Sequence, residues 1–431
     1  MSWASDGANG HAGACPPEGR ASARQVPAPA VGSSSLSRSL KICDVTQFYS
    51  PLSGGVKRYL QEKIRFIQNA SPGDEHILIV PGEENKVTVE ARSRVYTVRS
   101  PLISRSAQYR ALLDLRTLHE IIAREQPDII ESSDPYQLGW AVLKSGFAQR
   151  IPVVAFYHSH FSDAYLRRPS QWFGQTVSAA LMKATQRYVR NLYNRYETTF
   201  VASPRLARIL AAWGVRNTRL ADLGVNGDIF HPDGRPSEVR ETLGIPDARF
   251  LLLYVGRLAG EKNTETLFKA FSLLAERPEK NFHLLVLGDG QQRDLLRRLV
   301  SETHRVTWLQ YSTDSTELAK LYRAADLFVH PSVEETFGLV ALEAQACGTP
   351  VVGIRGSCLD DLIQHDQHSW ATENNPVALA DAIEAMCARP LEKMGDAAAA
   401  VVAERYSWPR VFERLFCVYH EVRARYRKGR G

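Results

Sequence analysis

The chain has 431 residues, of which 44% are hydrophobic and 23% charged, and its formal net charge is +6. Such a chain can bury a sizeable core in two or three domains, and its modest positive charge allows contact with phosphates, nucleotides or anionic lipid without indicating a nucleic-acid partner. The six cysteines form no CxxC pair and no apolar run reaches the length of a transmembrane helix, which excludes a disulfide scaffold and favours a cytosolic protein with reduced thiols.

The chain begins with residues 1–39, which are rich in Ala, Ser, Gly and Pro and lack the apolar middle segment of a signal peptide. We expect a disordered tail here. The alternative is a transit segment, because the stretch holds three arginines and few acids.

From residue 40, apolar strand-sized runs alternate with amphipathic helical patterns, which predicts an α/β fold of parallel sheets covered on both faces. The expected strands of a first domain lie at residues 40–46, 76–82, 94–100, 128–133, 152–159 and 198–203, with helices that include residues 55–70 and 110–126. After a Gly/Pro-rich stretch at residues 222–236, the pattern restarts with strands at 249–258, 282–290, 306–312, 326–332 and 350–354. We therefore predict domains at residues 40–222 and 223–405, followed by a terminal helix and tail at 406–431.

A glycine turn, "SPLSGGVKRYL", follows the first predicted strand and opens a helix. At Gly54 and Gly55 an anion could approach the backbone closely, and the helix start offers free N–H groups. An ordinary strand-to-helix turn is the alternative. The segment is no GxGxxG fingerprint, so it does not indicate a dinucleotide fold.

Two cations follow the strand at residues 249–258. Arg257 and Lys262 are placed at its carboxyl end, where they could hold a diphosphate, or form only a solvated basic loop. No Asp-x-Asp pair occurs in the chain, so we expect no metal site for a nucleotide diphosphate and no cofactor. His158 and His160, at the end of the strand at residues 152–159, lack a nearby carboxylate or cysteine and make a poor metal site.

The stretch "EETFGLVALEAQACG" places Glu335 in a loop and Glu343 inside the following helix, predicted over residues 337–348 with Gly348 as its C-cap. Between them Phe337, Gly338 and Leu339 would offer N–H groups to phosphate at the helix start. The carboxylates could accept hydrogen bonds from sugar and ribose hydroxyls. The alternatives are an acid/base pair as in glycoside hydrolysis, or two solvated glutamates.

These segments together resemble the retaining, nucleotide-sugar-dependent glycosyltransferases of family four, which have the GT-B fold. The resemblance covers about residues 40–427 and rests on "SGGVKRYL", "YHSH", "GVNGDIFHP", "VGRLAGEK", "VLGDG", "YRAADLFVHPS" and the Glu335–Glu343 stretch, in that order. It implies two Rossmann-like domains facing a central cleft, the first on the acceptor side and the second binding the nucleotide sugar. It also implies a terminal helix that crosses back to the first domain.

The resemblance implies roles for single residues as well. Glu335 would contact the transferred sugar and Glu343 the ribose, while Arg257 and Lys262 would neutralise the diphosphate. Gly55 would let the backbone approach phosphate or acceptor. His158 would lie near the reacting carbon. The family needs no metal.

Two departures from the family leave the donor sugar open. Many relatives carry Asp where this chain has Asn226. Many also carry a second glycine and then Pro-Glu where this chain has Ser357, Cys358 and Asp360. The second loop often borders the acceptor or the sugar.

The predicted acceptor is a membrane lipid. Basic and aromatic residues with almost no acids gather in the segment after "YHSH", namely Arg167, Arg168, Trp172, Phe173, Lys183, Arg187, Arg190 and Arg195. This composition suits the surface of an anionic membrane, or only a solvated helix face. "YHSH" also resembles segments of diacylglycerol glycosyl and sulfoquinovosyl transferases.

We therefore expect a cytoplasmic enzyme, peripheral on the inner face of the membrane, that moves a sugar from UDP or GDP to a lipid. The alternatives are a soluble or polysaccharide acceptor, a GT-B epimerase or phosphorylase, and a binding module with an inactive site.

Overall fold

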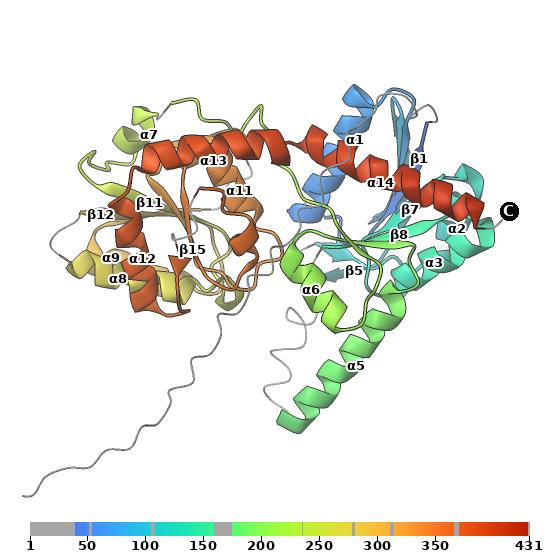
Figure 1. Cartoon of the computed structure of the whole chain (residues 1–431), viewed down its shortest axis with the longest axis horizontal. Coiled ribbons are helices and arrows are strands. Elements are labelled where there is room, and N and C mark those ends of the chain that lie inside the picture. Colours follow the sequence, from blue (N-terminus) through green and yellow to red (C-terminus); the bar gives the residue numbers. More distant parts are fainter. Residues whose placement is uncertain are drawn as a thin grey trace, which may run out of the picture. The chain divides into compact units, whose positions relative to one another are not determined.

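The structure is a computed structural model, and it describes residues 39–50, 54–104, 108–158, 175–234, 236–277, 281–310, 314–365 and 370–429. The tail predicted over residues 1–39 lies, except for Ser39, outside the described residues. Two mainly parallel sheets with helices packed against them dominate the rest (Figure 1). This arrangement confirms the predicted α/β class.

The first sheet has eight strands in the order β10-β9-β8-β7-β1-β2-β4-β3, and all neighbours are parallel except β3 and β4. Its strands are β1 (Lys41–Val45), β2 (Glu75–Gly82), β3 (Lys86–Glu90), β4 (Ser93–Arg99), β7 (Ile129–Ser132), β8 (Val153–Tyr157), β9 (Thr198–Val201) and β10 (Thr218–Leu220). Its helices are α1 (Gly55–Ala70), α2 (Leu115–Glu125), α3 (Gln137–Gln149), α5 (Gln175–Tyr193) and α6 (Pro204–Ala212), and a hairpin of β5 (Leu102–Ser104) and β6 (Tyr109–Arg110) lies apart from the sheet.

The two faces of this sheet pack against different helices, as the alternation of side chains along a strand requires. Cys43 and Val45 of β1 belong to a core that includes α2, α3, α5 and α6. Ile42 of β1 and Phe156 of β8 belong to a core with α1 and α14 (Trp408–Lys428). Because α14 ends the chain, the predicted return of the terminal helix to the first domain is confirmed.

The second sheet is parallel throughout, in the order β13-β12-β11-β14-β15-β16. Its strands are β11 (Phe250–Val255), β12 (Phe282–Leu287), β13 (Val306–Leu309), β14 (Leu327–His330), β15 (Val351–Ile354) and β16 (Trp370–Ala371). The helices are α7 (Ser237–Thr242), α8 (Thr264–Glu276), α9 (Arg293–Thr303), α10 (Ser315–Ala324), α11 (Leu339–Ala346), α12 (Pro376–Cys387) and α13 (Leu391–Tyr406), with 3₁₀ turns at Gly260–Lys262 and Cys358–Asp361. One face packs against α8, α9 and α12, and the other against α10 and α11.

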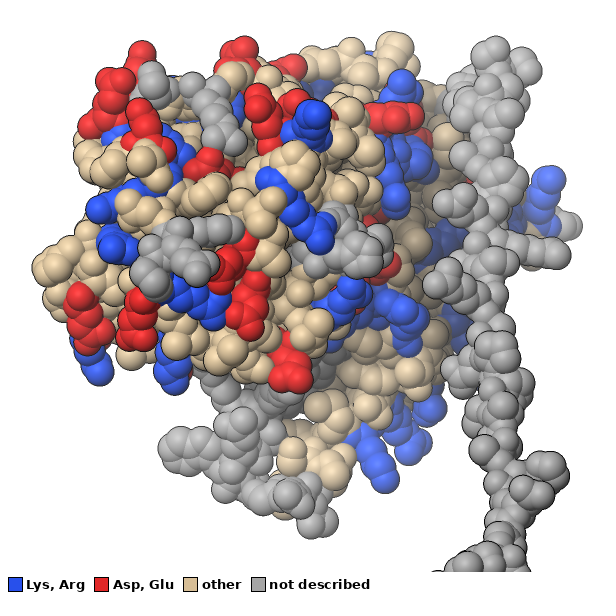
Figure 2. Space-filling view, turned by 60° about the vertical axis from the view of Figure 1, so that its left-hand side comes forward, with Lys and Arg blue, Asp and Glu red and all other residues tan. Residues whose placement is uncertain are grey.

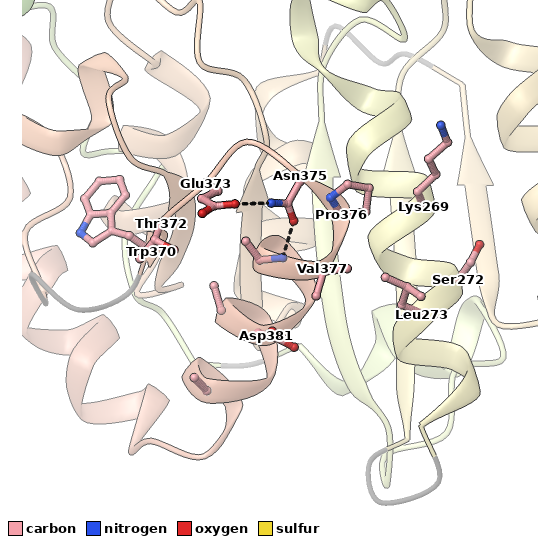
Figure 3. A pocket seen from close by; sticks show the side chains of 13 residues that line it. Lys269, Ser272, Leu273, Trp370, Thr372, Glu373, Asn375, Pro376, Val377 and Asp381 are labelled. Atoms are coloured by element: carbon pink, nitrogen blue, oxygen red, sulfur yellow. Dashed lines mark hydrogen bonds between the residues drawn. The ribbon is translucent and has the colours of Figure 1, made fainter.

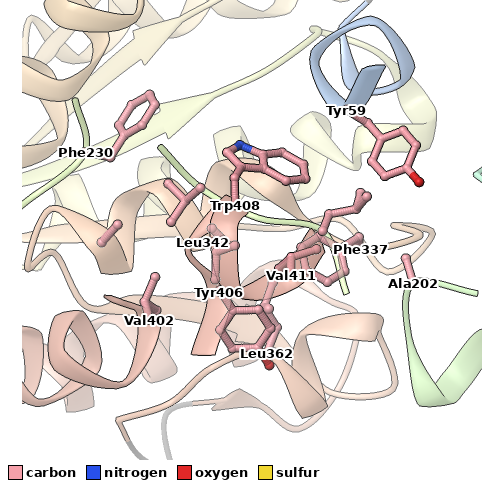
Figure 4. Packing of buried hydrophobic residues seen from close by; sticks show 14 of the residues in the cluster. Tyr59, Ala202, Phe230, Phe337, Leu342, Leu362, Val402, Tyr406, Trp408 and Val411 are labelled. Atoms are coloured by element: carbon pink, nitrogen blue, oxygen red, sulfur yellow. The ribbon is translucent and has the colours of Figure 1, made fainter. Parts of the chain in front are cut away.

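A single buried cluster contains residues of both sheets and of the terminal helix (Figure 4). Tyr59 of α1 lies near Trp408 of α14, with ring centroids 6.3 Å apart. Phe337, just before α11, meets Tyr406 at the end of α13 edge-on at 6.3 Å. The terminal helix is therefore part of the hydrophobic core.

The chain crosses from one sheet to the other twice, once between β10 and β11 and once between α13 and α14. The two crossing segments are in contact. Val225 and Ser407 form a parallel β-bridge, and the Val225 N–H donates to the Tyr406 carbonyl over 2.8 Å. A Cβ at Gly224 would lie 2.6 Å from Cδ2 of Trp408, so only glycine fits there. The first sheet ends at Leu220 and the second begins at Phe250. The boundary at residues 222/223 falls between them and stays a prediction.

Two predicted helix boundaries are wrong, and several strands, β3 among them, were not predicted. The helix predicted over residues 110–126 begins at Leu115, because the Asp114 carboxylate accepts from the Thr117 N–H and caps it. Strand β3 was not predicted, since all its residues are exposed and give no buried pattern. Helix α11 ends at Ala346 with Cys347 as C-cap, and Gly348 takes the left-handed conformation (φ +76°) one position later.

Candidate active site

The glycine turn opens α1 without a side-chain cap. Gly54 is the N-cap residue, no side-chain cap bond is present there among the described residues, and the first turn contains no acid. A Cβ at Gly54 would have no neighbour within 4 Å, and one at Gly55 would lie 3.9 Å from Cδ1 of Leu339 at the start of α11. Among the described residues, no side chain caps the start of α1, which is compatible with an approaching anion, and the anion-binding role of this turn stays a prediction.

Helix α11 also starts without a side-chain cap or an acid in its first turn. Its N-cap, Gly338, has φ +95°, and a Cβ there would lie 2.8 Å from Cδ2 of Leu359. Glycine is thus required both by the backbone angle and by the space. The starts of α1 and α11, neither of which has a side-chain cap among the described residues, lie near each other at Gly55 and Leu339.

Glu335 forms an ion pair with Lys262. The Lys262 Nζ lies 2.5 Å from Oε2 of Glu335, and Nε2 of His330 lies 3.8 Å from the same oxygen. Burial opposes ionisation of Glu335, but Lys262 and then His330 outweigh it and hold the pKa of this carboxyl below its ordinary value. A partly buried, ionised carboxylate therefore lies in the loop before α11.

Glu343 lies in the second turn of α11, not two turns inside, because the helix starts later than predicted. Its side chain is 3% exposed. Nη1 of Arg58 from α1 donates to Oε1, and the Tyr322 hydroxyl donates to Oε2 over 3.2 Å. Burial raises the pKa of Glu343, and Arg58 and Tyr322 offset part of that rise.

Arg257 lies apart from both carboxylates. Its side chain is 70% exposed and lies 3.5 Å from Oε1 of Glu261, while its backbone carbonyl accepts from the Tyr254 hydroxyl over 2.9 Å. Of the two predicted diphosphate ligands, Lys262 thus contacts Glu335, and Arg257 extends into solvent. Their shared role stays a prediction.

His158 follows β8 inside an aromatic setting. Its ring stacks on Phe156 with centroids 4.0 Å apart, and Tyr59 meets it edge-on at 5.1 Å. Burial, with help from Lys63, lowers its pKa to about 3, so the imidazole is neutral at physiological pH. Its Nε2 is buried and has no hydrogen-bond partner among the described residues.

The structure thus brings Gly55, Leu339, Glu343, Glu335 and Lys262 to the starts of α1 and α11. Sequence reasoning missed the two donors to Glu343. Arg58 stands in the quoted "SGGVKRYL" segment, one helical turn after Gly54, and Tyr322 in "YRAADLFVHPS". Only the helical spacing from Gly54 could have drawn attention to Arg58.

Both departures from the family pattern have local explanations. Oδ1 of Asn226 accepts from the Asp228 N–H over 3.0 Å, a bond that Asp would also make. The Asp360 carboxylate accepts from the Gly356 N–H at 3.1 Å and 3.2 Å, and Ser357 caps the short turn that follows. The loop is therefore closed by its own side chains.

Several predicted residues lie outside the described residues, namely His160, Arg167, Arg168, Trp172 and Phe173. Within the ranges that the structure describes, no three His, Cys, Asp or Glu side chains gather as metal ligands would. Over the same ranges, no helix has both the length and the apolar character needed to cross a bilayer.

A surface pocket of about 930 Å³ lies elsewhere, between α8 and α12 (Figure 3). Asn375 accepts from the Ala378 N–H and donates to Glu373, both over 2.8 Å, so its amide serves to cap α12. A second pocket of about 490 Å³ is lined by Glu83, Arg99, Ser100, Pro101 and Arg110. None of the predicted site residues lines either pocket, and the central cleft remains an implication of the resemblance.

Two family models match the chain in succession. Residues 53–228 match the model described as Glycosyltransferase Family 4, and residues 237–400 match the model described as Glycosyl transferases group 1. The two matches cover both sheets almost completely.

Curated relatives align over most of the chain. The GDP-mannose-dependent alpha-(1-6)-phosphatidylinositol dimannoside mannosyltransferase of Mycobacterium tuberculosis is 30% identical over 86% of this chain and 93% of its own length. The sulfoquinovosyl transferase SQD2 of Arabidopsis thaliana is 30% identical over 80% of this chain and 65% of its own length.

Solved structures show the same architecture. The sucrose-phosphate synthase of Thermosynechococcus elongatus has a TM-score of 0.70 at 22% identity and covers 89% of this chain and 99% of its own. The HepE protein of Anabaena, solved with UDP and glucose, has a TM-score of 0.66 at 19% identity and covers 89% of this chain and 100% of its own. These likenesses confirm the predicted fold, and the family matches confirm the predicted enzyme class. The chain belongs to the family-four, group 1 glycosyltransferases with the GT-B fold.

Proposed function

We propose that this glycosyltransferase moves a sugar from a UDP- or GDP-sugar to a hydroxyl group with retention at the anomeric carbon. One observation carries the proposal: Glu335 and Glu343 flank the uncapped start of α11, and each is paired with a cation in the ligand-free chain. The free N–H groups at such a start bind phosphate, and ionised carboxylates accept from hydroxyls.

In this proposal Glu335 accepts from hydroxyls of the transferred sugar and Glu343 from those of the ribose. The backbone of Phe337, Gly338 and Leu339, between the two carboxylates, donates to the diphosphate. The contacts of Glu335 with Lys262, and of Glu343 with Arg58 and Tyr322, support these roles, because they hold the carboxylates in one place.

Arg257 and Lys262 neutralise the charge that grows on the departing diphosphate, and the backbone at Gly55 approaches it from α1. Lys262 already lies at the site through Glu335, and the exposed Arg257 side chain is free to turn. We propose that these cations and the two helix starts do the work that a divalent metal does elsewhere, so that no metal or other cofactor takes part.

Retention without an enzymic nucleophile requires attack on the face that the leaving group vacates. The leaving phosphate then takes the acceptor proton, and the protein orients the acceptor. His158 suits a positioning role better than that of a base, because its pKa of about 3 leaves it neutral. Its Nε2, which has no partner among the described residues, could donate to or accept from the sugar.

For the acceptor we propose a membrane lipid, bound on the side of residues 40–222, with the nucleotide sugar on the side of residues 223–405. One of the relatives described above is a phosphatidylinositol dimannoside mannosyltransferase, whose name indicates a lipid acceptor. Helix α5 supports this choice, since Val177 and Leu181 are 53% and 37% exposed and its sequence contains no acid.

Lys183, Arg187 and Arg190 are exposed on the same helix. The lowest lobe in the space-filling view, at the height of α5 in Figure 1, shows basic and uncharged side chains without acidic ones (Figure 2). Apolar and cationic side chains together suit the interface of an anionic membrane, so we place the enzyme on the inner face of the cytoplasmic membrane.

The test is a thermal-shift screen of UDP, GDP, UDP-glucose and GDP-mannose, followed by transfer assays on vesicles of phosphatidylcholine with diacylglycerol or phosphatidylinositol. Binding of one nucleotide and labelling of lipid would support the proposal. Labelling of glycans only would favour a soluble or polysaccharide acceptor. Turnover of the donor without any acceptor would favour an epimerase or hydrolase.

Binding to vesicles is tested separately. Anionic vesicles should sediment the protein at low salt and release it at high salt. A variant with Val177→Ser, Leu181→Ser, Lys183→Gln and Arg187→Gln should lose this binding and keep its affinity for nucleotide. Sedimentation equal to that of the unmodified chain would exclude α5 as the membrane contact.

A further inference from the structure

One ion pair joins the two helix starts of the candidate site. Arg58 lies one turn into α1, beside the first sheet, and its Nη1 donates to Oε1 of Glu343 in α11, beside the second. The two residues are 285 positions apart in the chain. Next to them, a Cβ added at Gly55 would lie 3.9 Å from Cδ1 of Leu339. The pair therefore links the two parts of the chain at the place where the nucleotide is proposed to bind.

The two partners of Glu343 differ in freedom. Tyr322 is fully buried, lies between Phe230 and Phe328, and has little freedom to move. The Arg58 side chain is 37% exposed and can turn toward solvent by rotation about its own bonds. Any ligand that needs Oε1 of Glu343 therefore displaces Arg58 rather than Tyr322.

A ribose needs the same oxygens. Its 2′ and 3′ hydroxyls are neighbouring donors, and a carboxylate that binds both presents both of its oxygens to them. A buried carboxylate oxygen without a donor would be costly, and Tyr322 donates only to Oε2, so Oε1 of Glu343 requires another donor when no ribose is bound. The guanidinium of Arg58 supplies it.

We infer that Arg58 and the ribose compete for Glu343. The Arg58 guanidinium donates to this carboxylate when no nucleotide is bound, and it is displaced when the nucleotide binds. The inference rests on the proposed ribose-binding role of Glu343 and adds the exchange of partners at that residue. Nucleotide binding then breaks the contact between α1 and α11 through Arg58, so that occupancy of the site is coupled to the freedom of the two sheets to move.

The experiment measures dissociation constants of UDP and GDP by calorimetry, with every variant at the same pH. Arg58→Ala removes the competitor and should bind the preferred nucleotide tighter, by on the order of tenfold, the value of one modest charge-assisted bond. Arg58→Gln, which keeps most of the length without the charge, should shift in the same direction and provides a second variant if alanine impairs folding. Arg58→Lys keeps the positive charge, so its affinity for the nucleotide should stay close to that of the unmodified chain.

Two controls separate competition from general effects. Arg65→Ala changes a surface arginine on the same helix, 57% exposed and paired only locally with Glu62 in the contacts described, and should leave both dissociation constants unchanged. The 2′,3′-dideoxy form of the nucleotide cannot use Glu343. For this analogue, the gain in Arg58→Ala should disappear.

The possible results point in different directions. Equal or weaker nucleotide binding by Arg58→Ala and Arg58→Gln, with binding by the unmodified chain intact, would overturn the inference and leave the proposed function standing. Of these two results, weaker binding would also indicate that Arg58 contacts the diphosphate directly. If the unmodified chain bound neither UDP nor GDP, the proposed function would fall, and the exchange at Glu343 with it.

Discussion

Lys63 of α1 donates to the hydroxyl of Tyr419 in α14 over 3.0 Å, and neither side chain reaches solvent. The same ammonium group contacts Asp44 of β1 at 2.9 Å and Glu131 of β7 at 3.1 Å, and Tyr419 also donates to Glu131. The terminal helix is thus joined to the first sheet through one buried cation, the ammonium group of Lys63 in α1.

Lys63→Met should therefore destabilise the protein strongly. The change leaves two buried carboxylates without their cation, and removal of one partner from a buried pair costs about 3–5 kcal/mol. Urea denaturation measures the loss. Lys86→Met, on the fully exposed strand β3, is the matched control and should change the free energy of unfolding by about 0.5 kcal/mol or less. Similar losses of unfolding free energy in both variants would mean that the contacts of Lys63 with Asp44, Glu131 and Tyr419 contribute little to stability.

The two glutamates of the site should separate in their effects. Glu343→Ala should weaken binding of the bare nucleoside diphosphate, because it removes the proposed ribose ligand. Glu335→Ala should keep that affinity and lose sugar transfer. Calorimetry with UDP and GDP and a transfer assay with the preferred donor give the two readouts. Normal binding and turnover in both variants would reduce the pair to a structural feature.

Replacement of the cations should slow transfer. Lys262→Ala and Arg257→Ala each remove a charge-assisted bond to the leaving group, worth about 1.5–3 kcal/mol, so turnover should fall by roughly one to two orders of magnitude. Added Mg²⁺ or Mn²⁺ should not restore it. Inhibition of the unmodified enzyme by a chelator would contradict the assignment of this work to Arg257 and Lys262.

His158→Ala should fold, bind nucleotide normally and transfer sugar poorly. The loss of a positioning contact of this kind can reduce the rate about a hundredfold. His158→Asn, which can still donate one hydrogen bond near the same place, should recover part of the rate. An unchanged rate in the alanine variant would assign His158 to the aromatic core alone.

Stability should fall as the pH is lowered below 6.5. Burial lowers the pKa of His158 to about 3 and that of His330 to about 4, from an ordinary value of 6.5. The unfolded chain therefore takes up protons between pH 6.5 and 4 that the folded chain does not, which favours unfolding at acid pH. At pH 5 the cost is about 2 kcal/mol for each of these two histidines. Urea denaturation at pH 7 and pH 5 should show a smaller loss for His158→Phe, and an equal loss would disprove this origin.

Sequence reasoning found the parts of the site that are set by local order along the chain. Lys262 follows β11 and Glu335 follows β14, and because these strands are neighbours in a parallel sheet, their carboxyl ends meet. Gly338 was expected in the first turn of a helix predicted over residues 337–348, and the structure makes it the N-cap of α11 instead. Strand ends that carry buried side chains were likewise predicted to within a few residues, as in β1 and β8.

The pairs made between distant segments could not be found in this way. Arg58 and Glu343 have no shared periodicity, and Lys63 looks like any polar residue on an amphipathic helix until Asp44 and Glu131 are placed beneath it. Such contacts depend on how the sheets and α14 pack, and one sequence carries no signal of that packing.

The bridge between Val225 and Ser407 has a mechanical consequence. Both crossings of the chain from one sheet to the other run through this point, and the Val225–Tyr406 hydrogen bond and the tight fit of Gly224 on Trp408 hold them together. Two connections fastened at one place act as a single pivot. Movement of one half of the enzyme against the other is thereby limited to turning about that pivot, and sliding of the halves past each other would break the bridge.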